Sequence, residues 1–244
     1  MKKCYSCNNK PTKNGVYKRN IEKFIFEQLP NNNSHYHKKG TSSRIIEKLK
    51  PNTCIFYFAT MNKSFTTLLK NFKDAYDKLE NSGVTRTDSN GNAKFFLDCP
   101  QVYISLDRKV YDRHIHYLYW DEKYRIWNKN LYTQSIICDI DKKFVLQNMK
   151  KCLLIDTLPS KMYKNKHIKG AYNIPFNKRI NENDLEKYIF EKFNNKSKNI
   201  PIIVYCYNAN CIAAIKVLKK LNKLGYNNVV HYKDGIESWN GPIE

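Results

Sequence analysis

The feature that most constrains the fold is the alternation of short apolar runs with helical patterns in the C-terminal part of the chain. Leu153–Ile155 and Ile202–Tyr205 are runs rich in β-branched residues, and helical patterns occupy residues 144–149, 184–193 and 212–224. Continuous apolar runs are typical of strands that are buried on both faces of a parallel sheet. The sequence therefore predicts an α/β domain with a parallel sheet in this part of the chain.

Cys206 lies where the second apolar run gives way to a helix. A cysteine is a nucleophile only as the thiolate, and a free thiol has a pKa of about 8.5. Backbone N–H groups and the positive end of a helix dipole would favour the thiolate at this position. We therefore predict that Cys206 is reactive and that its cradle is the backbone of Tyr207, Asn208, Ala209 and Asn210. The plainer alternative is a buried core thiol.

Three separated blocks carry a resemblance to a known family. They are Leu154–Asp156 followed by His167–Pro175, then Tyr205–Cys211, then Gly235–Trp239 followed by Pro242. In order and spacing they resemble the rhodanese-type sulfurtransferases. The resemblance implies a rhodanese-like α/β fold that needs no cofactor, in which Cys206 takes sulfane sulfur from a donor as a persulfide and passes it to a thiol acceptor. It also implies that Asp156, His167, Gly235 and Trp239 orient the loops and do not react.

The loop departs from the family pattern at its end. The family usually has Arg there, whereas this chain has Cys211, and no basic residue lies between Cys206 and Cys211. An anionic donor such as thiosulfate loses its nearest cation, and phosphatase chemistry is disfavoured for the same reason. Cys211 could attack a persulfide or sulfenate on Cys206, leaving a disulfide and releasing sulfide or water. The alternative is that Cys211 only packs in the first helical turn.

A second resemblance lies in the middle of the chain. Its blocks are Thr87–Phe95, Pro100–Tyr103, Arg113–Tyr117 and Tyr132–Gln134, and they resemble the β-sandwich core of intradiol ring-cleavage dioxygenases. The resemblance implies His114, His116 and Tyr103 as candidate iron ligands, with Tyr57 and Tyr76 as candidates for a further tyrosine. Two histidines two residues apart on a strand point to the same face. The alternatives are a sandwich without metal and a protein-binding module.

These patterns divide the chain into three segments. Residues 1–45 are polar and basic, and we expect a flexible arm with a short helical stretch at residues 21–29. Residues 46–145 form the predicted β-sandwich, and residues 146–244 form the predicted rhodanese-like domain. Within the middle segment, apolar residues recur at helical spacing from Phe65 to Leu79, which predicts an amphipathic helix that ends at Gly83.

The charge of the chain favours anionic partners. Lys and Arg number 43 against 22 Asp and Glu, so the formal net charge is +21. Such a charge gives nonspecific affinity for nucleic acid or anionic membranes. The alternative is the lysine bias of an AT-rich genome, which the many Asn and Tyr residues also indicate.

The eight cysteines are scattered through the chain, a pattern typical of reduced core thiols in an intracellular protein. No apolar run is long enough to span a membrane, and the N-terminus has no signal-like core. We therefore expect a cytoplasmic protein. A competing hypothesis is a non-enzymatic, structural protein packaged in a virus particle. Cys4 and Cys7 with His35 and His37 form a weak candidate zinc site.

Overall fold

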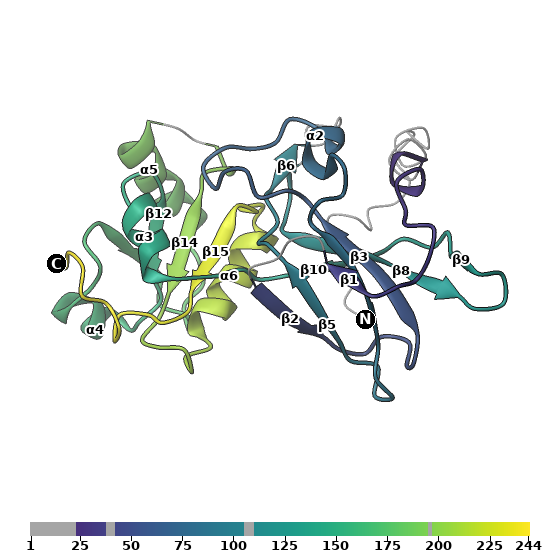
Figure 1. The fold of residues 1–244 in the computed structure, drawn as a ribbon. Coiled ribbons are helices and arrows are strands. Elements are labelled where there is room, and N and C mark those ends of the chain that lie inside the picture. Colours follow the sequence, from purple (N-terminus) through teal and green to yellow (C-terminus); the bar gives the residue numbers. More distant parts are fainter. Residues whose placement is uncertain (1–22, 38–41, 105–109, 195–196) are drawn as a thin grey trace. The chain divides into compact units, whose positions relative to one another are not determined.

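The computed structural model describes residues 23–37, 42–104, 110–194 and 197–244 of the chain (Figure 1). The chain forms two compact units, one that ends at Ile136 and one that begins at Ile137. Each unit has its own sheets. Among the described residues, no helix is long and apolar enough to cross a membrane.

The second unit is built on a five-stranded sheet in the order β11-β15-β14-β12-β13, and every pair of neighbouring strands is parallel. The strands are β11 (Asp139–Ile140), β12 (Leu153–Asp156), β13 (Ala171–Asn173), β14 (Ile202–Tyr205) and β15 (Val229–Tyr232). All residues of β12, β14 and β15 are buried. The predicted α/β architecture with a parallel sheet is therefore confirmed, because apolar runs without a polar face need cover on both sides.

Four helices accompany this sheet (Figure 1): α3 (Lys142–Asn148), α4 (Ser160–Asn165), α5 (Glu182–Phe193) and α6 (Ala213–Lys223). The side chains of Asp141 and Asn181 accept backbone N–H groups at the starts of α3 and α5. The helix α6 lies against β14 and β15 and buries Ala214, Val217 and Leu221. Its apolar stripe is the pattern expected of a helix that packs on a sheet.

The first unit consists of antiparallel sheets. Its main sheet has the order β1-β4-β3-β8-β10, β9 pairs with β8, and two ribbons pair β2 with β5 and β6 with β7. The strands are β1 (Tyr36–His37), β2 (Ser42–Ile46), β3 (Cys54–Ala59), β4 (Ser82–Arg86), β5 (Ala93–Leu97), β6 (Tyr103–Ile104), β7 (Val110–Tyr111), β8 (His114–Asp121), β9 (Ile126–Trp127) and β10 (Tyr132–Ser135). The likeness of this unit to an intradiol dioxygenase sandwich stays a prediction.

The central strand β3 separates two apolar cores. Phe56 and Phe58 point into one core, which also contains α2 (Phe72–Tyr76), and Ile55 and Tyr57 point into the other, which contains β5. All six residues of β3 are buried. Because alternate residues of a strand face opposite sides, one strand supplies both cores.

The predicted long helix over residues 65–79 is wrong. Only Phe72–Tyr76 is helical, and the side chain of Asn71 accepts the N–H of Asp74 at its start. Before it, Leu69 is extended and bridges to Tyr103. Gly83 does not end a helix but lies in β4, where a Cβ would collide with the Tyr57 hydroxyl. The apolar side chains at helical spacing are buried without one continuous helix.

The described part of the expected arm over residues 1–45 contains the expected short helical stretch and packs on the first unit. Ile25 is fully buried in the first core, and residues 23–26 are helical. The carbonyl of Pro30 accepts a hydrogen bond from Trp127 Nε1 at 2.8 Å, and β1 pairs with β4. A few apolar anchors thus hold a mostly polar segment. Residues 1–22, including Cys4 and Cys7 of the candidate zinc site, lie outside the described residues.

Candidate functional site

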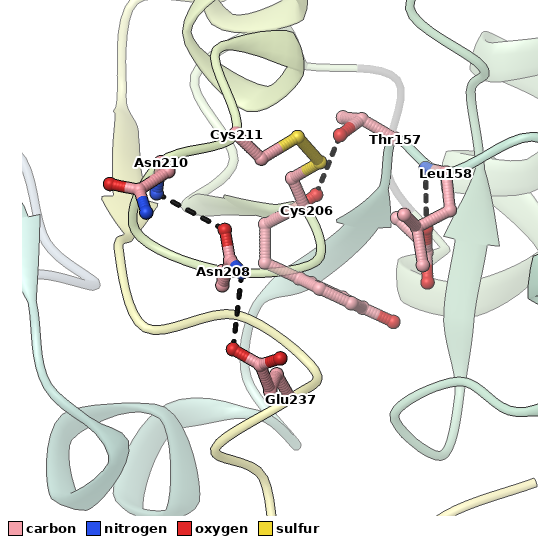
Figure 2. The surroundings of a disulfide bond; sticks show 9 residues. Thr157, Leu158, Cys206, Asn208, Asn210, Cys211 and Glu237 are labelled. Carbon is pink, nitrogen blue, oxygen red and sulfur yellow. Dashed lines mark hydrogen bonds between the residues drawn. A yellow bond between two sulfur atoms is a disulfide. The ribbon is translucent and has the colours of Figure 1, made fainter.

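The candidate site is the loop from Cys206 to Cys211, which joins the carboxyl end of β14 to α6. The carbonyl of Tyr205 accepts hydrogen bonds from Thr157 N at 3.1 Å and Thr157 Oγ1 at 2.8 Å. These bonds fix the end of β14 against the segment that follows β12 (Figure 2). The adjoining Cys206 is 2% exposed. The loop therefore begins from a rigid, buried strand end.

A disulfide joins Cys206 to Cys211, with their Cα atoms 6.2 Å apart (Figure 2). Between them, Asn208 organises a turn. Its carbonyl accepts Cys211 N at 3.0 Å, its Oδ1 accepts Asn210 N at 3.1 Å, and its Nδ2 donates to Glu237 Oε2 at 3.1 Å. One N–H group of the predicted cradle, that of Asn210, and the N–H group of Cys211 are therefore bonded to Asn208 while the disulfide is present. The turn holds the two sulfur atoms together.

The segment that follows β15 packs against the loop and donates hydrogen bonds to its carbonyl groups. Ile236 N donates to Cys206 O at 3.0 Å, and Glu237 N donates to Tyr207 O at 2.9 Å. Gly235 has a φ of +67°, and a Cβ there would collide with the carbonyl oxygens of Cys206 and Tyr207. Trp239 is buried, and its Nε1 donates to Pro242 O at 3.0 Å. The block around Gly235 therefore lies directly against the thiol loop.

Asp156 and His167 both lie in the second unit, where each contacts residues outside the loop from Cys206 to Cys211. Asp156 is fully buried at the end of β12, where its Oδ1 accepts Leu158 N at 2.7 Å. Burial raises the pKa of the Asp156 carboxyl, and the hydrogen bond from Leu158 opposes the rise. The imidazole of His167 stacks on Tyr163 with centroids 3.8 Å apart, and its Nε2 lies 3.3 Å from Glu244 Oε2. Asp156 therefore holds the end of β12 to the segment that follows it, and His167 contacts both Tyr163 and Glu244.

The expectation of reduced core thiols holds for only part of the described cysteines. Cys54 and Cys152 are free and buried, and burial raises the pKa of the Cys152 thiol to about 12. Cys206 is bonded to Cys211, and Cys99 and Cys138 are also disulfide-bonded. The expectation was wrong for Cys99 and Cys138, because residue counts do not tell which cysteines have the Cα separation that a disulfide needs. For Cys206 and Cys211 a loop disulfide was one of the alternatives.

A second cluster lies inside the first unit, on β8. His114 and His116 point to the same face, as predicted, and are 2% and 6% exposed. The Tyr76 hydroxyl lies 3.1 Å from His114 Nε2 and 2.9 Å from His116 Nε2. Tyr103 packs against Tyr76 with ring centroids 5.7 Å apart. Of the two further tyrosine candidates, Tyr76 is at the cluster and Tyr57 points into the other core.

Each imidazole is held by a contact at its Nδ1 atom, whereas its Nε2 atom faces Tyr76. His114 Nδ1 lies 2.6 Å from Asp112 O, and His116 Nδ1 lies 2.8 Å from Thr133 Oγ1. A carbonyl only accepts, so His114 donates from Nδ1 and its Nε2 accepts the Tyr76 hydroxyl proton. His116 Nε2–H then donates to the Tyr76 oxygen. Burial, and then repulsion from His114, holds the pKa of His116 well below its usual range, so the His116 ring is neutral.

The residue types at this cluster restrict what it can bind. Within the described ranges, no three His, Cys, Asp or Glu side chains gather into a metal-binding group. The third side chain at the two imidazoles is the phenol of Tyr76.

His37, from the candidate zinc site, stacks on Phe96 with centroids 4.9 Å apart.

Comparison with known proteins identifies the second unit. Residues 141–242 match the family model described as the rhodanese-like domain. An uncharacterized protein of Buchnera aphidicola is 34% identical over 112 residues, which are 46% of this chain and 69% of that protein. The adenylyltransferase and sulfurtransferase UBA4 of Candida albicans is 28% identical over 127 residues, or 51% of this chain and 25% of UBA4. The match thus spans only a quarter of the length of UBA4.

Solved structures are also similar to this chain. The BH2092 protein of Bacillus halodurans is 31% identical, with a TM-score of 0.37 over 44% of this chain and 76% of that one. A rhodanese-like domain of Anabaena is 20% identical, with a TM-score of 0.34 over 45% of this chain and 80% of that one.

The contact under the loop predicts that Gly235→Ala is strongly destabilising. The substitution adds the cost of a left-handed alanine to a collision with two carbonyl oxygens, so we expect a loss of more than about 2 kcal/mol in the free energy of unfolding. Gly170→Ala is the matched control, because Gly170 has a φ of +75° but its Cβ would meet nothing closer than 3.7 Å. Urea denaturation measures both. Equal losses would show that the collision is absent.

The raised pKa of Asp156 predicts a pH dependence. The folded carboxyl keeps its proton to a higher pH than the unfolded one, so above about pH 4 the free energy of unfolding falls as pH rises, by at most about 1.4 kcal/mol per unit, until the folded pKa is passed. Asp156→Asn keeps the acceptor for Leu158 N and should remove this fall. Urea denaturation from about pH 4 to about pH 7 measures it. The exposed Asp234→Asn is the control, and a fall that persists in Asp156→Asn contradicts the assignment.

Proposed function

Because the chain belongs to the rhodanese-like family through residues 141–242, we propose that it is a sulfurtransferase that loads sulfane sulfur on Cys206 and releases it with Cys211. The observation that carries this proposal is the disulfide between the two residues. It places the sulfur of Cys211 within reach of the sulfur of Cys206. The name of the Candida albicans relative, which includes a sulfurtransferase, agrees with this chemistry.

The first step is sulfur transfer from the donor. The Cys206 thiolate attacks the outer sulfur of a persulfide donor, R–S–SH, and the bond between the two donor sulfurs breaks. The electron pair of that bond leaves with the donor as a thiolate, R–S⁻, and the proton stays on the transferred outer sulfur. Cys206 then carries a persulfide. This is covalent catalysis in which an activated thiolate holds the transferred group.

The second step uses Cys211. Its thiolate attacks the sulfur atom of Cys206, the bond from Cys206 to the outer sulfur breaks, and hydrogen sulfide leaves with the persulfide proton. The product is the Cys206–Cys211 disulfide, in which the two cysteines have lost two electrons to the released sulfur. Alternatively, an acceptor thiol takes the outer sulfur first, and Cys206 returns as the thiolate.

The charges at the loop favour an uncharged or protein-bound persulfide over a small dianion as donor. No cation lies between Cys206 and Cys211 in the sequence. The nearest side chain bonded to the loop is the Glu237 carboxylate, which accepts from Asn208. A carboxylate beside the loop repels an anionic donor such as thiosulfate.

The proposal predicts different effects of the two cysteine substitutions. With an uncharged persulfide donor, R–S–SH, and excess reductant, Cys206→Ser abolishes sulfide release. Cys211→Ser still accepts one sulfur but releases sulfide at least about tenfold more slowly, because an intramolecular attack becomes a bimolecular one. Sulfide formation is measured with time. Cys152→Ser, which changes a buried free thiol, is the control.

Two outcomes decide against this function. Full sulfide release by Cys206→Ser would place the chemistry elsewhere. No sulfur loading by any donor would favour a structural protein that keeps a rhodanese-like fold.

A second candidate function is metal binding in the first unit, and the geometry around Tyr76 favours it. The ligand atoms of a metal with bonds of about 2.1 Å lie about 3 Å apart at right angles. The Tyr76 oxygen is separated from the two Nε2 atoms by 3.1 and 2.9 Å. His114, His116 and Tyr76 thus fit three corners of such a site, with Tyr103 beside them. Two neutral imidazoles and a phenolate suit ferric iron, which would act as a Lewis acid.

Contacts at their Nδ1 atoms orient the two imidazoles without a metal ion. Asp112 O and Thr133 Oγ1 contact the Nδ1 atoms and so keep both Nε2 atoms aimed at Tyr76. Such outer hydrogen bonds fix the ring orientation of histidine ligands. The metal-free hydrogen-bond chain through Tyr76 is the competing arrangement, and it needs no ion.

The metal proposal predicts iron in protein that is purified without a His tag. We expect close to one equivalent by elemental analysis and a visible tyrosinate absorption band, because phenolate bound to ferric iron absorbs visible light. Tyr76→Phe removes the band, whereas Tyr57→Phe, in the other core, keeps it. Protein that takes up no metal after incubation with ferrous or ferric salts contradicts the proposal.

A further inference from the structure

We propose that the Cys206–Cys211 disulfide is reduced by a protein thiol with acidic neighbours, which docks beside Cys211. The docking surface consists of Phe176, Ile212, Lys216 and Lys220, and we call it the α6 surface. This inference rests on the proposed function, because each release of sulfide leaves a disulfide that must be reduced before the next cycle.

Burial decides which sulfur the incoming thiol attacks. Cys206 is 2% exposed at the end of β14, whereas Cys211 is only partly buried. Thiol–disulfide exchange requires access to the attacked sulfur and is faster when the departing thiolate is stable. Attack on Cys211 meets both requirements, because Cys206 is the residue placed to be a thiolate. The docking surface should therefore lie on the Cys211 side of the loop.

The exchange occurs in two balanced steps. A thiolate of the partner bonds to the Cys211 sulfur, the Cys206–Cys211 bond breaks, and its electron pair leaves with Cys206. A second thiol of the partner then attacks the partner's own sulfur in this mixed disulfide and expels Cys211. The partner is oxidised to a disulfide, the loop gains two electrons, and the two protons of the partner thiols pass to the two cysteines or to water.

The apolar part of the α6 surface begins next to Cys211. Ile212 is 63% exposed and directly precedes α6. Lys216 N donates to Ile212 O at 3.1 Å, and Lys216 Nζ lies 5.4 Å from the centroid of the Phe176 ring. Phe176 is 36% exposed, and its N–H donates to Thr157 O. The two large apolar side chains thus flank Lys216 beside the loop.

The charged part of the surface is cationic. Lys220 Nζ donates to Phe176 O at 2.7 Å and to Lys178 O at 2.9 Å, which places its charge at the same turn. Within the part of the chain that the structure describes, neither Lys216 nor Lys220 forms an ion pair with a carboxylate. The carboxylate of Glu237 is bonded to Asn208, in the middle of the loop. An acidic partner is therefore attracted to the α6 side.

The α6 surface, with two large apolar and two cationic side chains, favours a protein over a small thiol as the reductant. A small thiol needs access only to the Cys211 sulfur and gains nothing from Phe176 or Lys216. Large exposed apolar side chains ringed by charge are typical of protein interfaces. Acidic residues beside the partner thiol would contact Lys216, and an apolar neighbour would contact Ile212 and Phe176.

The test measures reduction of the oxidised full-length protein by three thiols at low salt. These are a dithiol peptide with Asp and Glu around its cysteines, the same peptide with Asn and Gln instead, and 2-mercaptoethanol. Electrostatic attraction raises association rates by about tenfold or more. We expect the acidic peptide to be about tenfold faster than the neutral one, and the difference to shrink as salt rises.

Substitutions test whether the preference for the acidic peptide arises at the α6 surface. Lys216→Glu should reduce the preference for the acidic peptide to about twofold or less, and it should leave the rate with 2-mercaptoethanol unchanged. Lys223→Glu is the matched control, because it makes the same charge change on the same helix, about 10 Å further from the loop. Ile212→Ser should slow both peptides but not 2-mercaptoethanol.

Three results would overturn the inference: equal rates for the two peptides, a preference that Lys216→Glu leaves intact, or a rate with 2-mercaptoethanol that matches the acidic peptide. The last result would indicate a small-molecule reductant. None of them bears on sulfur loading, which is measured with a persulfide donor on the reduced protein. A failure of the proposed function is therefore seen separately.

Discussion

The parallel pairing of β14 between β12 and β15 is the constraint on which the site depends. It buries β14 on both faces and brings the carboxyl ends of three strands to one edge of the sheet. Thr157 follows β12, Cys206 follows β14 and Gly235 follows β15 soon after, so these residues meet at that edge. The contacts at that edge include backbone hydrogen bonds from Thr157 N to Tyr205 O and from Ile236 N to Cys206 O, and a bond from the Thr157 hydroxyl to Tyr205 O. The position of Cys206 is thus set by the sheet.

This origin explains why the second unit could be predicted from its sequence. The apolar runs of β12 and β14 have no polar face, and only a sheet covered on both sides buries them. Gly235 was identified within a block of sequence, and the structure gives its reason, because only a residue without a Cβ fits under the two loop carbonyls. The disulfide was one of two alternatives for Cys211, and the sequence did not choose between them, since spacing along the chain does not give the distance between two sulfur atoms.

The first unit was harder to predict for a physical reason. Residues 65–79 have the spacing of a helix, yet Leu69 pairs with Tyr103 and only Phe72–Tyr76 is helical. An aromatic-rich segment can bury the same side chains in several backbone conformations, so periodicity alone does not choose between them. The projection of His114 and His116 to the same face followed from strand geometry, whereas the position of Tyr76 depends on a contact between distant segments.

The central claim is that Cys206 carries the sulfur and Cys211 removes it. The most direct measurement is mass spectrometry of the intact Cys211→Ser protein after exposure to a persulfide donor, followed by fragmentation of the loop peptide. The account predicts that the mass of one added sulfur atom is retained on Cys206, and that the wild-type protein under the same conditions carries the Cys206–Cys211 disulfide in its place. A Cys211→Ser protein with no added sulfur, or with the sulfur on another cysteine, would contradict it.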